Sequence, residues 1–299
     1  MNVFMTGATG FVGRHVLDAL KNTDNRVLVL TRQNIELDFE EVLSGDLNNL
    51  EVLKPRILEF CPDVVIHLAW EGIPDYSESL SRANLYNSIN LLEYIINNAS
   101  CKKILVSGSC WEYGKKIGIC KESDPVNIDS YFTWAKHSLY QYLSVKCSEN
   151  NVVLNWFRNF YVYGPGQRKG SLIPMLINSI GVKETPKIKS PLNKNDFVYV
   201  EDVARAFSVA FDANLPSGVY NLGSGNVTSV YEIYRMVEMN LLGTETLSKQ
   251  ALGNGQKVET VNFWADMEKT EHALNMSCKT SMREGIKKLI QSMHLRSVG

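Results

Sequence analysis

Three glycines near the start of the chain have the spacing of a phosphate-binding turn. Gly7, Gly10 and Gly13 follow one another at three-residue intervals, directly after the apolar residues 3–5. Apolar residues then recur at helical spacing over 12–20, which predicts a strand, a glycine turn and a helix. Such glycines let the backbone turn sharply and let a pyrophosphate approach the helix N-terminus. The pattern predicts a dinucleotide site, although glycines also end strands for purely structural reasons.

An arginine stands where a site of this kind selects between cofactors. Residues 26–31 form a second apolar run, and Arg32 follows it about nineteen residues beyond Gly13. A cofactor with a free ribose 2′-hydroxyl usually meets Asp or Glu here, whereas an arginine suits a 2′-phosphate. Arg32 therefore favours NADP(H). The alternative is an ordinary surface arginine that closes a strand.

The elements that must position these residues alternate along the chain. Apolar runs at 64–69, 103–109 and 152–157 are typical of buried strands, and amphipathic stretches at 82–98 and 134–146 are typical of helices. Such alternation predicts an α/β protein with a doubly wound parallel Rossmann sheet, whose ligand crevice lies at the carboxyl ends of the strands. The residues expected to bind the cofactor there are Thr6, Gly7, Gly10, Phe11, Val12, Gly13, Arg32, Asp46, Leu47, Leu68 and Ala69.

The regular alternation fades after 164–166, where prolines begin to interrupt it. Residues 1–164 are therefore predicted to form the NADP-binding Rossmann domain. Residues 165–299 are predicted to form mainly a smaller, mixed α/β substrate-binding lobe, with segments near 196–222 returning to the Rossmann domain.

Composition argues against several other classes of function. The formal net charge is -1 with interspersed signs, so no nucleic-acid partner is expected. No signal peptide precedes the first strand and no apolar stretch reaches the ~18 residues of a membrane span, which predicts a cytoplasmic protein. The six cysteines form no C-x-x-C pair and no Cys/His cluster, so reduced thiols and no metal are expected.

Five ordered motifs together resemble one known family. They are Thr6-Gly7-Ala8-Thr9-Gly10-Phe11-Val12-Gly13, Ser107-Gly108-Ser109 followed by Tyr113-Gly114, Val162-Tyr163-Gly164-Pro165-Gly166-Gln167, the run 196–203 (DFVYVEDV), and the run 220–225 (YNLGSG). The chain resembles the extended short-chain dehydrogenase/reductase family of NAD(P)-dependent nucleotide-sugar epimerases, dehydratases and reductases. The resemblance covers nearly all of the chain.

The resemblance implies a catalytic hydroxyl, tyrosine and lysine. Ser109 matches the hydroxyl position and Lys136 the lysine, which would also bind the cofactor ribose. Four residues before Lys136, where the family has tyrosine, stands Phe132, and the nearest phenol is Tyr131. Helix positions five apart point away from each other, so Tyr131 is aligned only if the helix starts late or bulges. Tyr131 is predicted as the proton donor; alternatively Phe132 fills the slot and the acid is water, Ser109 or another residue.

The neighbours of Ser109 bear on the type of reaction. The family's 4,6-dehydratases have Asp-Glu directly after the hydroxyl residue, where this chain has Cys110 and Trp111, so dehydration is disfavoured. The cysteine acid of 3,5-epimerase-reductases would fall at Trp111, one place from Cys110. Ketone reduction and C4 epimerisation remain, and Arg32 favours reduction because epimerases of the family usually retain NAD. The predicted function is NADPH-dependent reduction of the C4 keto group of a dTDP-, CDP- or GDP-linked 4-keto-6-deoxysugar for a surface polysaccharide. The alternatives are a C4 epimerase that retains NAD and a non-catalytic cofactor-sensing protein.

The substrate and partner predictions rest on fewer residues. Arg168 is expected to meet the sugar diphosphate, and Trp111, Glu112 and Trp134 to wall the sugar pocket, with a solvated loop and a packed core as the respective alternatives. The stretches 82–98 and 134–146 resemble the helices through which the family dimerises as a four-helix bundle. A homodimer is therefore expected.

Overall fold

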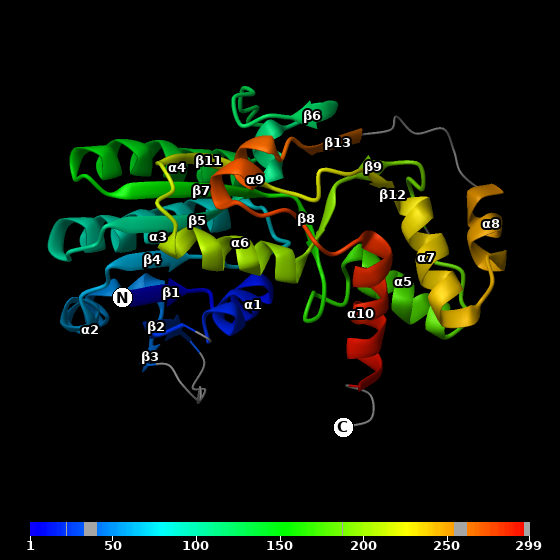
Figure 1. The fold of residues 1–299 in the computed structure, drawn as a ribbon, viewed down its shortest axis with the longest axis horizontal. Coiled ribbons are helices and arrows are strands. Elements are labelled where there is room, and N and C mark those ends of the chain that lie inside the picture. The colour runs from blue at the N-terminus through cyan, green and yellow to red at the C-terminus, as the bar shows by residue number, and fades with distance from the viewer. Residues whose placement is uncertain (22, 33–40, 187, 254–261, 296–299) are drawn as a thin grey trace.

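The protein has two lobes of unequal size that lie side by side (Figure 1). A computed structural model describes residues 1–21, 23–32, 41–186, 188–253 and 262–295. The larger lobe holds the N-terminus and a central sheet, and the smaller lobe holds most of the helices of the C-terminal third.

The larger lobe is built on seven strands that all pair in parallel. Most of their side chains are apolar and buried, as expected for a sheet covered on both faces. The predicted α/β class with a doubly wound parallel sheet is thereby confirmed. In spatial order the strands are β11 (Gly218–Leu222), β7 (Val153–Asn159), β5 (Lys103–Ser109), β4 (Val64–His67), β1 (Asn2–Thr6), β2 (Arg26–Thr31) and β3 (Glu41–Ser44).

Helices cover both faces of this sheet. One face packs against α1 (Phe11–Leu20) and α6 (Val200–Asp212), and the other against α2 (Lys54–Phe60), α3 (Glu78–Asn98) and α4 (Tyr131–Glu149). The last of these begins three residues earlier than the sequence predicts, because the Ser130 hydroxyl caps it by accepting a hydrogen bond from Thr133 N at 3.2 Å. Tyr131 is thus the first residue of α4.

The smaller lobe combines two short sheets with helices. One sheet pairs β8 with β10 and the other has the order β12-β9-β13-β6. Although α6 and β11 follow residue 164 in the chain, they pack in the larger lobe; the division at that residue stays a prediction. The remaining elements are η1 (Leu47–Val52), η2 (Cys110–Tyr113), β6 (Gly118–Cys120), β8 (Tyr161–Tyr163), α5 (Leu172–Gly181), β9 (Lys194–Asn195), β10 (Phe197–Tyr199), β12 (Thr228–Ser229), α7 (Val230–Leu242), α8 (Thr246–Gly253), β13 (Asn262–Ala265), α9 (Glu268–Leu274) and α10 (Met282–Leu295).

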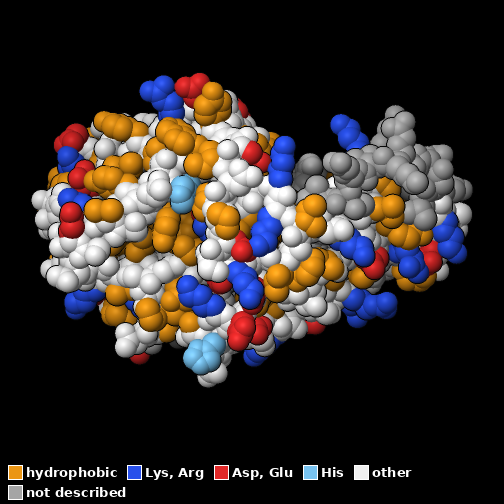
Figure 2. Space-filling model, turned by 90° about the horizontal axis from the view of Figure 1, so that it is seen from above, with side chains coloured by type: hydrophobic (Ala, Val, Ile, Leu, Met, Phe, Trp, Pro, Cys, Tyr) orange, Lys and Arg blue, Asp and Glu red, His pale blue; other side chains and the backbone are white. Residues whose placement is uncertain are grey.

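Figure 2 shows one face of the molecule, on which charges of both signs are mixed. Apolar side chains gather over the larger lobe on the same face. Within the part of the chain that the structure describes, none of the helices is both long and apolar enough to span a bilayer.

Candidate active site

The glycine turn between β1 and α1 leaves no room for side chains. Gly7 has φ +74°, and its carbonyl oxygen accepts a hydrogen bond from Gly10 N at 3.0 Å. A Cβ on Gly13 would lie 2.0 Å from that same oxygen, so the first turn of α1 rests directly on the end of the strand. The backbone is therefore open to close approach by a ligand, as the sequence predicts for a pyrophosphate.

Two hollows meet at this turn, at the carboxyl ends of the strands. The larger is a cleft of about 770 Å³ and the smaller has a volume of about 200 Å³; Gly7, Gly10 and Leu68 line both. Every residue predicted to bind the cofactor lies along one or both of them. The cleft includes Phe11, Val12, Gly13 and Lys136, and the smaller hollow includes Thr6, Arg32, Asp46, Leu47 and Ala69. The structure brings the predicted set together, and the binding role of each residue stays a prediction.

Ser109 and Lys136 both line the cleft. Ser109 ends β5, and its hydroxyl accepts a hydrogen bond from Trp111 N at 3.2 Å. Lys136 is buried, donates from Nζ to Ser107 O at 2.7 Å, and lies 3.9 Å from the ring centre of Trp70. Burial lowers the pKa of Lys136 to about 7, while the negative charge of Glu112 acts in the opposite direction. A lysine in this state can both give and take a proton near neutral pH.

The adjacent residues Tyr131 and Phe132 occupy different environments. Tyr131 is 52% exposed and is not among the described residues that line the cleft, whereas Phe132 is 6% exposed and does line it. The ring of Phe132 packs against Trp111 at 5.8 Å, Tyr76 at 5.1 Å and Trp70 at 5.6 Å between ring centres. The regular start of α4 thus places the phenyl ring in the cleft that Ser109 and Lys136 also line, as expected for a position four residues before the lysine.

Two of these aromatic residues, Trp70 and Tyr76, were not predicted from the sequence. Trp70 and Tyr76 line the cleft with Trp111, and Tyr76 packs on Trp111 at 4.9 Å between ring centres. Trp70 comes directly after the strand predicted at 64–69, where residues lie at the ligand crevice, and that position was the signal that could have found it. Tyr76 lies further along the same loop and had no such signal. Trp134 is not among the described residues that line the cleft.

Two carboxylates flank Arg32 at the smaller hollow. Its guanidinium pairs with Glu71 and lies 3.9 Å from Asp46. Glu71 was not predicted as part of the site; it follows the same strand end as Trp70. Arg32 is more than half exposed. Because Glu71 and Asp46 already lie against its guanidinium, a cofactor phosphate would bind Arg32 only in competition with these carboxylates.

Arg168 lines the cleft on the side of the smaller lobe. It follows Gln167, which donates from Nε2 to Val162 O at 3.1 Å and ties the loop to β8. Glu112, predicted to wall the sugar pocket, is instead completely buried and does not contact the cleft. Its carboxylate turns back under η2, because it caps the start of that helix.

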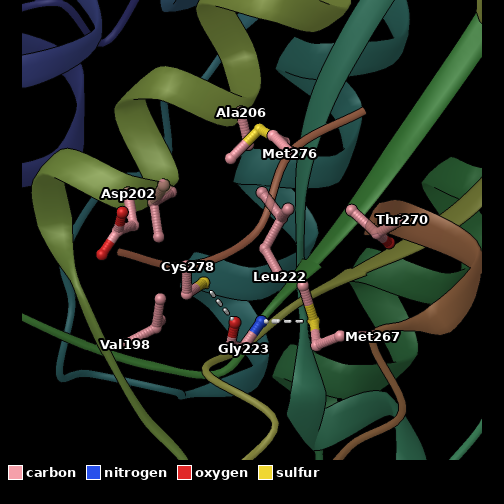
Figure 3. A pocket seen from close by; sticks show the side chains of 10 residues that line it. Val198, Asp202, Ala206, Leu222, Gly223, Met267, Thr270, Met276 and Cys278 are labelled. Carbon is pink, nitrogen blue, oxygen red and sulfur yellow. Dashed lines mark hydrogen bonds between the residues drawn. The ribbon is translucent and has the colours of Figure 1, made fainter. Parts of the chain in front are cut away.

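Cys110, at the cleft, and Cys278, away from it, are packed side chains. Burial raises the pKa of Cys110 far above its usual range. A separate hollow of about 10 Å³, close to the size of one water, is lined by Cys278, which donates to Gly223 O at 2.9 Å. Figure 3 shows Cys278 directed toward Gly223 in this hollow. Burial also raises the pKa of Cys278 to about 12. Among the described residues, His, Cys, Asp and Glu form no group of three that could hold a metal ion.

A sequence model of the NAD dependent epimerase/dehydratase family matches residues 3–223. Among the curated relatives, a putative UDP-glucose 4-epimerase of Methanocaldococcus jannaschii is 26% identical over 97% of this chain and 98% of its own length. A dTDP-6-deoxy-L-talose 4-dehydrogenase (NAD(+)) of Aggregatibacter actinomycetemcomitans is 24% identical over 77% of this chain and 87% of its own length.

Solved structures with the same fold cover almost the whole chain. The UDP-glucose 4-epimerase of Thermotoga maritima, solved with UDP-glucose, has a TM-score of 0.84 at 22% identity and covers 100% of both chains. The dTDP-glucose 4,6-dehydratase of Bacillus anthracis, solved with NAD, has a TM-score of 0.84 at 21% identity and covers 100% of this chain and 98% of its own.

Proposed function

Because the chain belongs to the NAD dependent epimerase/dehydratase family, we propose that it reduces the C4 keto group of a nucleotide-linked 4-keto-6-deoxysugar with NADPH. The sugar would be linked to dTDP, CDP or GDP. The reaction would take place in the cytoplasm, and its product would serve the synthesis of a surface polysaccharide. The observation that carries this proposal is that Ser109 and Lys136 line the same cleft and that burial lowers the pKa of Lys136 to about 7.

The glycine turn fits a dinucleotide. A Cβ on Gly7 would lie 2.6 Å from Ala69 N, and one on Gly13 would meet the carbonyl of Gly7, so the cradle exists only because both residues lack side chains. The pyrophosphate would rest on the N-terminus of α1, and Lys136 would hold the nicotinamide ribose. When bound, the reduced cofactor supplies the hydride that the sugar carbon receives.

Ser109 and Lys136 would manage the proton that must follow the hydride. Reduction leaves a negative charge on the former carbonyl oxygen, and the Ser109 hydroxyl can hold that oxygen by a hydrogen bond. An ammonium with a pKa of about 7 is a competent acid toward an alkoxide, so Lys136 would give the proton directly or through Ser109. This assignment replaces the predicted role of Tyr131, which does not line the cleft.

The cleft lacks the groups that a dehydratase of the family would use. Among the described residues that line it, none is Asp or Glu, which leaves a dehydratase without its acid and base. In an epimerase the same group must first take a proton from a sugar alcohol and later return one; with Phe132 at the position of the family's phenol, both transfers would fall to Lys136. The aromatic rings of Trp111, Tyr76 and Phe132 also suit the apolar face of a deoxysugar.

The proposal is tested by measuring NADPH oxidation with dTDP-, CDP- and GDP-linked 4-keto-6-deoxyhexoses. One nucleotide sugar is expected to give stoichiometric oxidation, and the others much less. If none of them is reduced and no nucleotide sugar is epimerised, the non-catalytic cofactor-sensing protein replaces the enzyme.

A C4 epimerase that retains NAD is the second candidate. The carboxylates of Glu71 and Asp46 beside Arg32 favour it, because they partly neutralise the arginine and suit a ribose hydroxyl. Relatives described as 4-epimerases also support it. Such a protein would purify with NAD bound and would interconvert C4 epimers without net consumption of NADPH.

Replacing Arg32 with alanine separates the two cofactors. Arg32→Ala is expected to weaken NADPH binding by on the order of tenfold or more and to change NADH binding by less than about threefold, because only NADPH has a 2′-phosphate. The control is Arg26→Ala, which removes an exposed arginine at the other end of β2. Equal losses for both cofactors, measured by fluorescence titration, would contradict the NADPH assignment.

We also propose a homodimer through a four-helix bundle of α3 and α4. The two helices pack on each other and expose large apolar side chains, Tyr86 on α3 and Val145 on α4. Such side chains are common where surfaces associate. Size-exclusion chromatography at micromolar concentration is expected to give the mass of a dimer. The double variant Tyr86→Glu/Val145→Glu is expected to give a monomer, and a monomeric parent protein would contradict the proposal.

A further inference from the structure

A carboxylate from the loop after β4 holds the arginine at the smaller hollow. Glu71 Oε1 pairs with Arg32 Nη1, and both side chains line this hollow. Arg32 follows β2 and Glu71 follows β4, and these two strands flank β1 in the sheet. The pair therefore joins the two sides of the crevice at the strand ends where the cofactor ribose is expected.

The main chain of Glu71 is fixed by a buried asparagine of α3. Asn84 Oδ1 accepts a hydrogen bond from Glu71 N at 2.7 Å, and Asn84 Nδ2 donates to Glu71 O at 3.1 Å. The same Nδ2 also donates to Leu80 O at 2.9 Å, within α3. Asn84 is only 8% exposed, so this contact is part of the packed helix. The carboxylate of Glu71 thus extends from a main chain that is held on both sides of its peptide unit.

The second carboxylate near Arg32 is engaged elsewhere. Asp46 Oδ1 accepts hydrogen bonds from Asn48 N at 2.8 Å and from Asn48 Nδ2 at 2.6 Å, and it caps the start of η1. The other oxygen of Asp46 lies 3.9 Å from Arg32 Nη1, which is beyond hydrogen-bond distance. Of the two carboxylates, Glu71 is therefore the one that occupies the guanidinium directly.

A carboxylate and a phosphate bind an arginine through the same donors. The planar guanidinium can present two N–H groups to two oxygens of either anion, and the charges on both partners strengthen these hydrogen bonds. A 2′-phosphate must therefore displace a carboxylate that is already in place. The side chains of Arg32 and Glu71 are 59% and 46% exposed, so an incoming phosphate can reach the pair and exchange with the carboxylate.

We infer that Glu71 is a specificity-determining residue that competes with the cofactor 2′-phosphate for Arg32. The inference rests on the proposed function, in which NADPH is the reductant. Glu71 lowers the preference for NADP(H) over NAD(H), because NAD(H) has no phosphate for which Arg32 is needed. It also takes Arg32 back as the phosphate leaves. A reductase must release its oxidised cofactor after each turnover, so this exchange favours net reduction.

The test is a double-mutant cycle of Glu71→Gln and Arg32→Ala, in which calorimetric titration at low ionic strength gives the Kd of NADP⁺ and of NAD⁺. Glu71→Gln is expected to tighten NADP⁺ binding by about fivefold and to change NAD⁺ binding by less than about twofold. In the Arg32→Ala background, the same substitution is expected to change NADP⁺ binding by less than about twofold, because the group for which the anions compete is gone.

Two control variants accompany the cycle. Glu71→Ala leaves no side-chain oxygen to hold Arg32, and it is expected to give the same result as Glu71→Gln. Glu78→Gln removes the carboxylate of another exposed pair, in which Arg82 Nη1 lies 3.6 Å from Glu78 Oε1 on α3. That variant is expected to leave both affinities unchanged.

Two further measurements separate competition from a merely structural effect. In stopped-flow displacement, NADP⁺ is expected to dissociate from Glu71→Gln about fivefold more slowly than from the parent protein, because the phosphate keeps the arginine. The gain in affinity is also expected to shrink at about 1 M salt, where the Debye length falls to about 3 Å and the ion pair of the parent is screened. A change in packing would show neither effect.

Unchanged NADP⁺ affinity in Glu71→Gln, or a gain that persists in the Arg32→Ala background, would overturn the inference. The titrations need no sugar, so they separate the inference from the proposed function. If the parent binds NAD⁺ far more tightly than NADP⁺ and Glu71→Gln still tightens NADP⁺ binding through Arg32, the NADPH-dependent reductase fails and the inference stands. If NADP⁺ binding depends on Arg32 but not on Glu71, the reductase stands and the inference fails.

Discussion

Gly13→Ala is expected to abolish cofactor binding, weakening it by on the order of 100-fold or more, since the pyrophosphate site is made of backbone that the added methyl group would displace. The new Cβ would lie 2.0 Å from Gly7 O and 2.8 Å from Gly7 C. Both atoms belong to the main chain, so no flexible side chain can yield. Either α1 moves away from the strand end or the glycine turn opens, and both changes remove the anion cradle.

The same steric clash is expected to lower the free energy of unfolding. Overpacking of this kind costs about 3 kcal/mol, so the melting temperature of Gly13→Ala should fall by several degrees. The matched control is Gly181→Ala, at the end of α5, where an added Cβ has no described atom within 4 Å apart from its chain neighbours and the backbone of its own helix. Calorimetric titration with NADP⁺ and NAD⁺ measures the affinity. Parent-like affinity in Gly13→Ala would show that the cofactor does not rest on this turn.

Lys136→Met is expected to lower turnover by on the order of 10³-fold, in the range that a lost general acid gives. Methionine fills a similar volume but cannot donate a proton to the alkoxide or to Ser109. The loss should not come from unfolding. Burial holds the pKa of Lys136 at about 7, below its value of 10.5 in an unfolded chain, so the ammonium destabilises the fold fully below pH 7. This penalty disappears as pH rises toward 10.5, and methionine removes it at any pH.

The melting temperature of Lys136→Met at pH 6 is therefore expected to equal or exceed that of the parent, while turnover collapses. Tyr131→Phe is the comparison: its side chain is half exposed, and turnover is expected to stay within about threefold of the parent. If Tyr131→Phe instead lowers turnover more than tenfold, the phenol reaches the substrate and the assignment of Lys136 as the acid fails. Parent-like turnover in Lys136→Met would contradict it as well.

The sequence predicts the larger lobe better than the smaller one, for a physical reason. Strands such as 64–67 and 103–109 are apolar runs between helices with apolar faces, so local periodicity is sufficient to identify them. The short strands of the smaller lobe have no such signature. Residues 118–120 pair with 263–265, far away in sequence, and these strands exist only because the tertiary fold brings them together.

The residues of the candidate site likewise divide into those that the sequence predicts and those that only the structure places. The glycines and Arg32 could be predicted because phosphate recognition imposes fixed spacings. The alignment of Phe132 with Lys136 follows from helix geometry, yet the structure was needed to place Tyr131 outside the cleft. Glu112 was predicted on the wall of the pocket because its exposure cannot be read from sequence. The spacing Ser109-x-x-Glu112 is that of a capping box, and it was the available sign that this side chain turns inward.

The most direct test of the central claim follows the hydride itself. NADPH that carries deuterium at the transferable C4 position would be incubated with the accepted 4-keto-6-deoxyhexose, and the product analysed by mass spectrometry and NMR. Net reduction predicts one deuterium at sugar C4 for each NADPH oxidised, and loss of that transfer in Lys136→Met. C4 epimers that form without net oxidation of NADPH, or a product without deuterium at C4, would contradict the account.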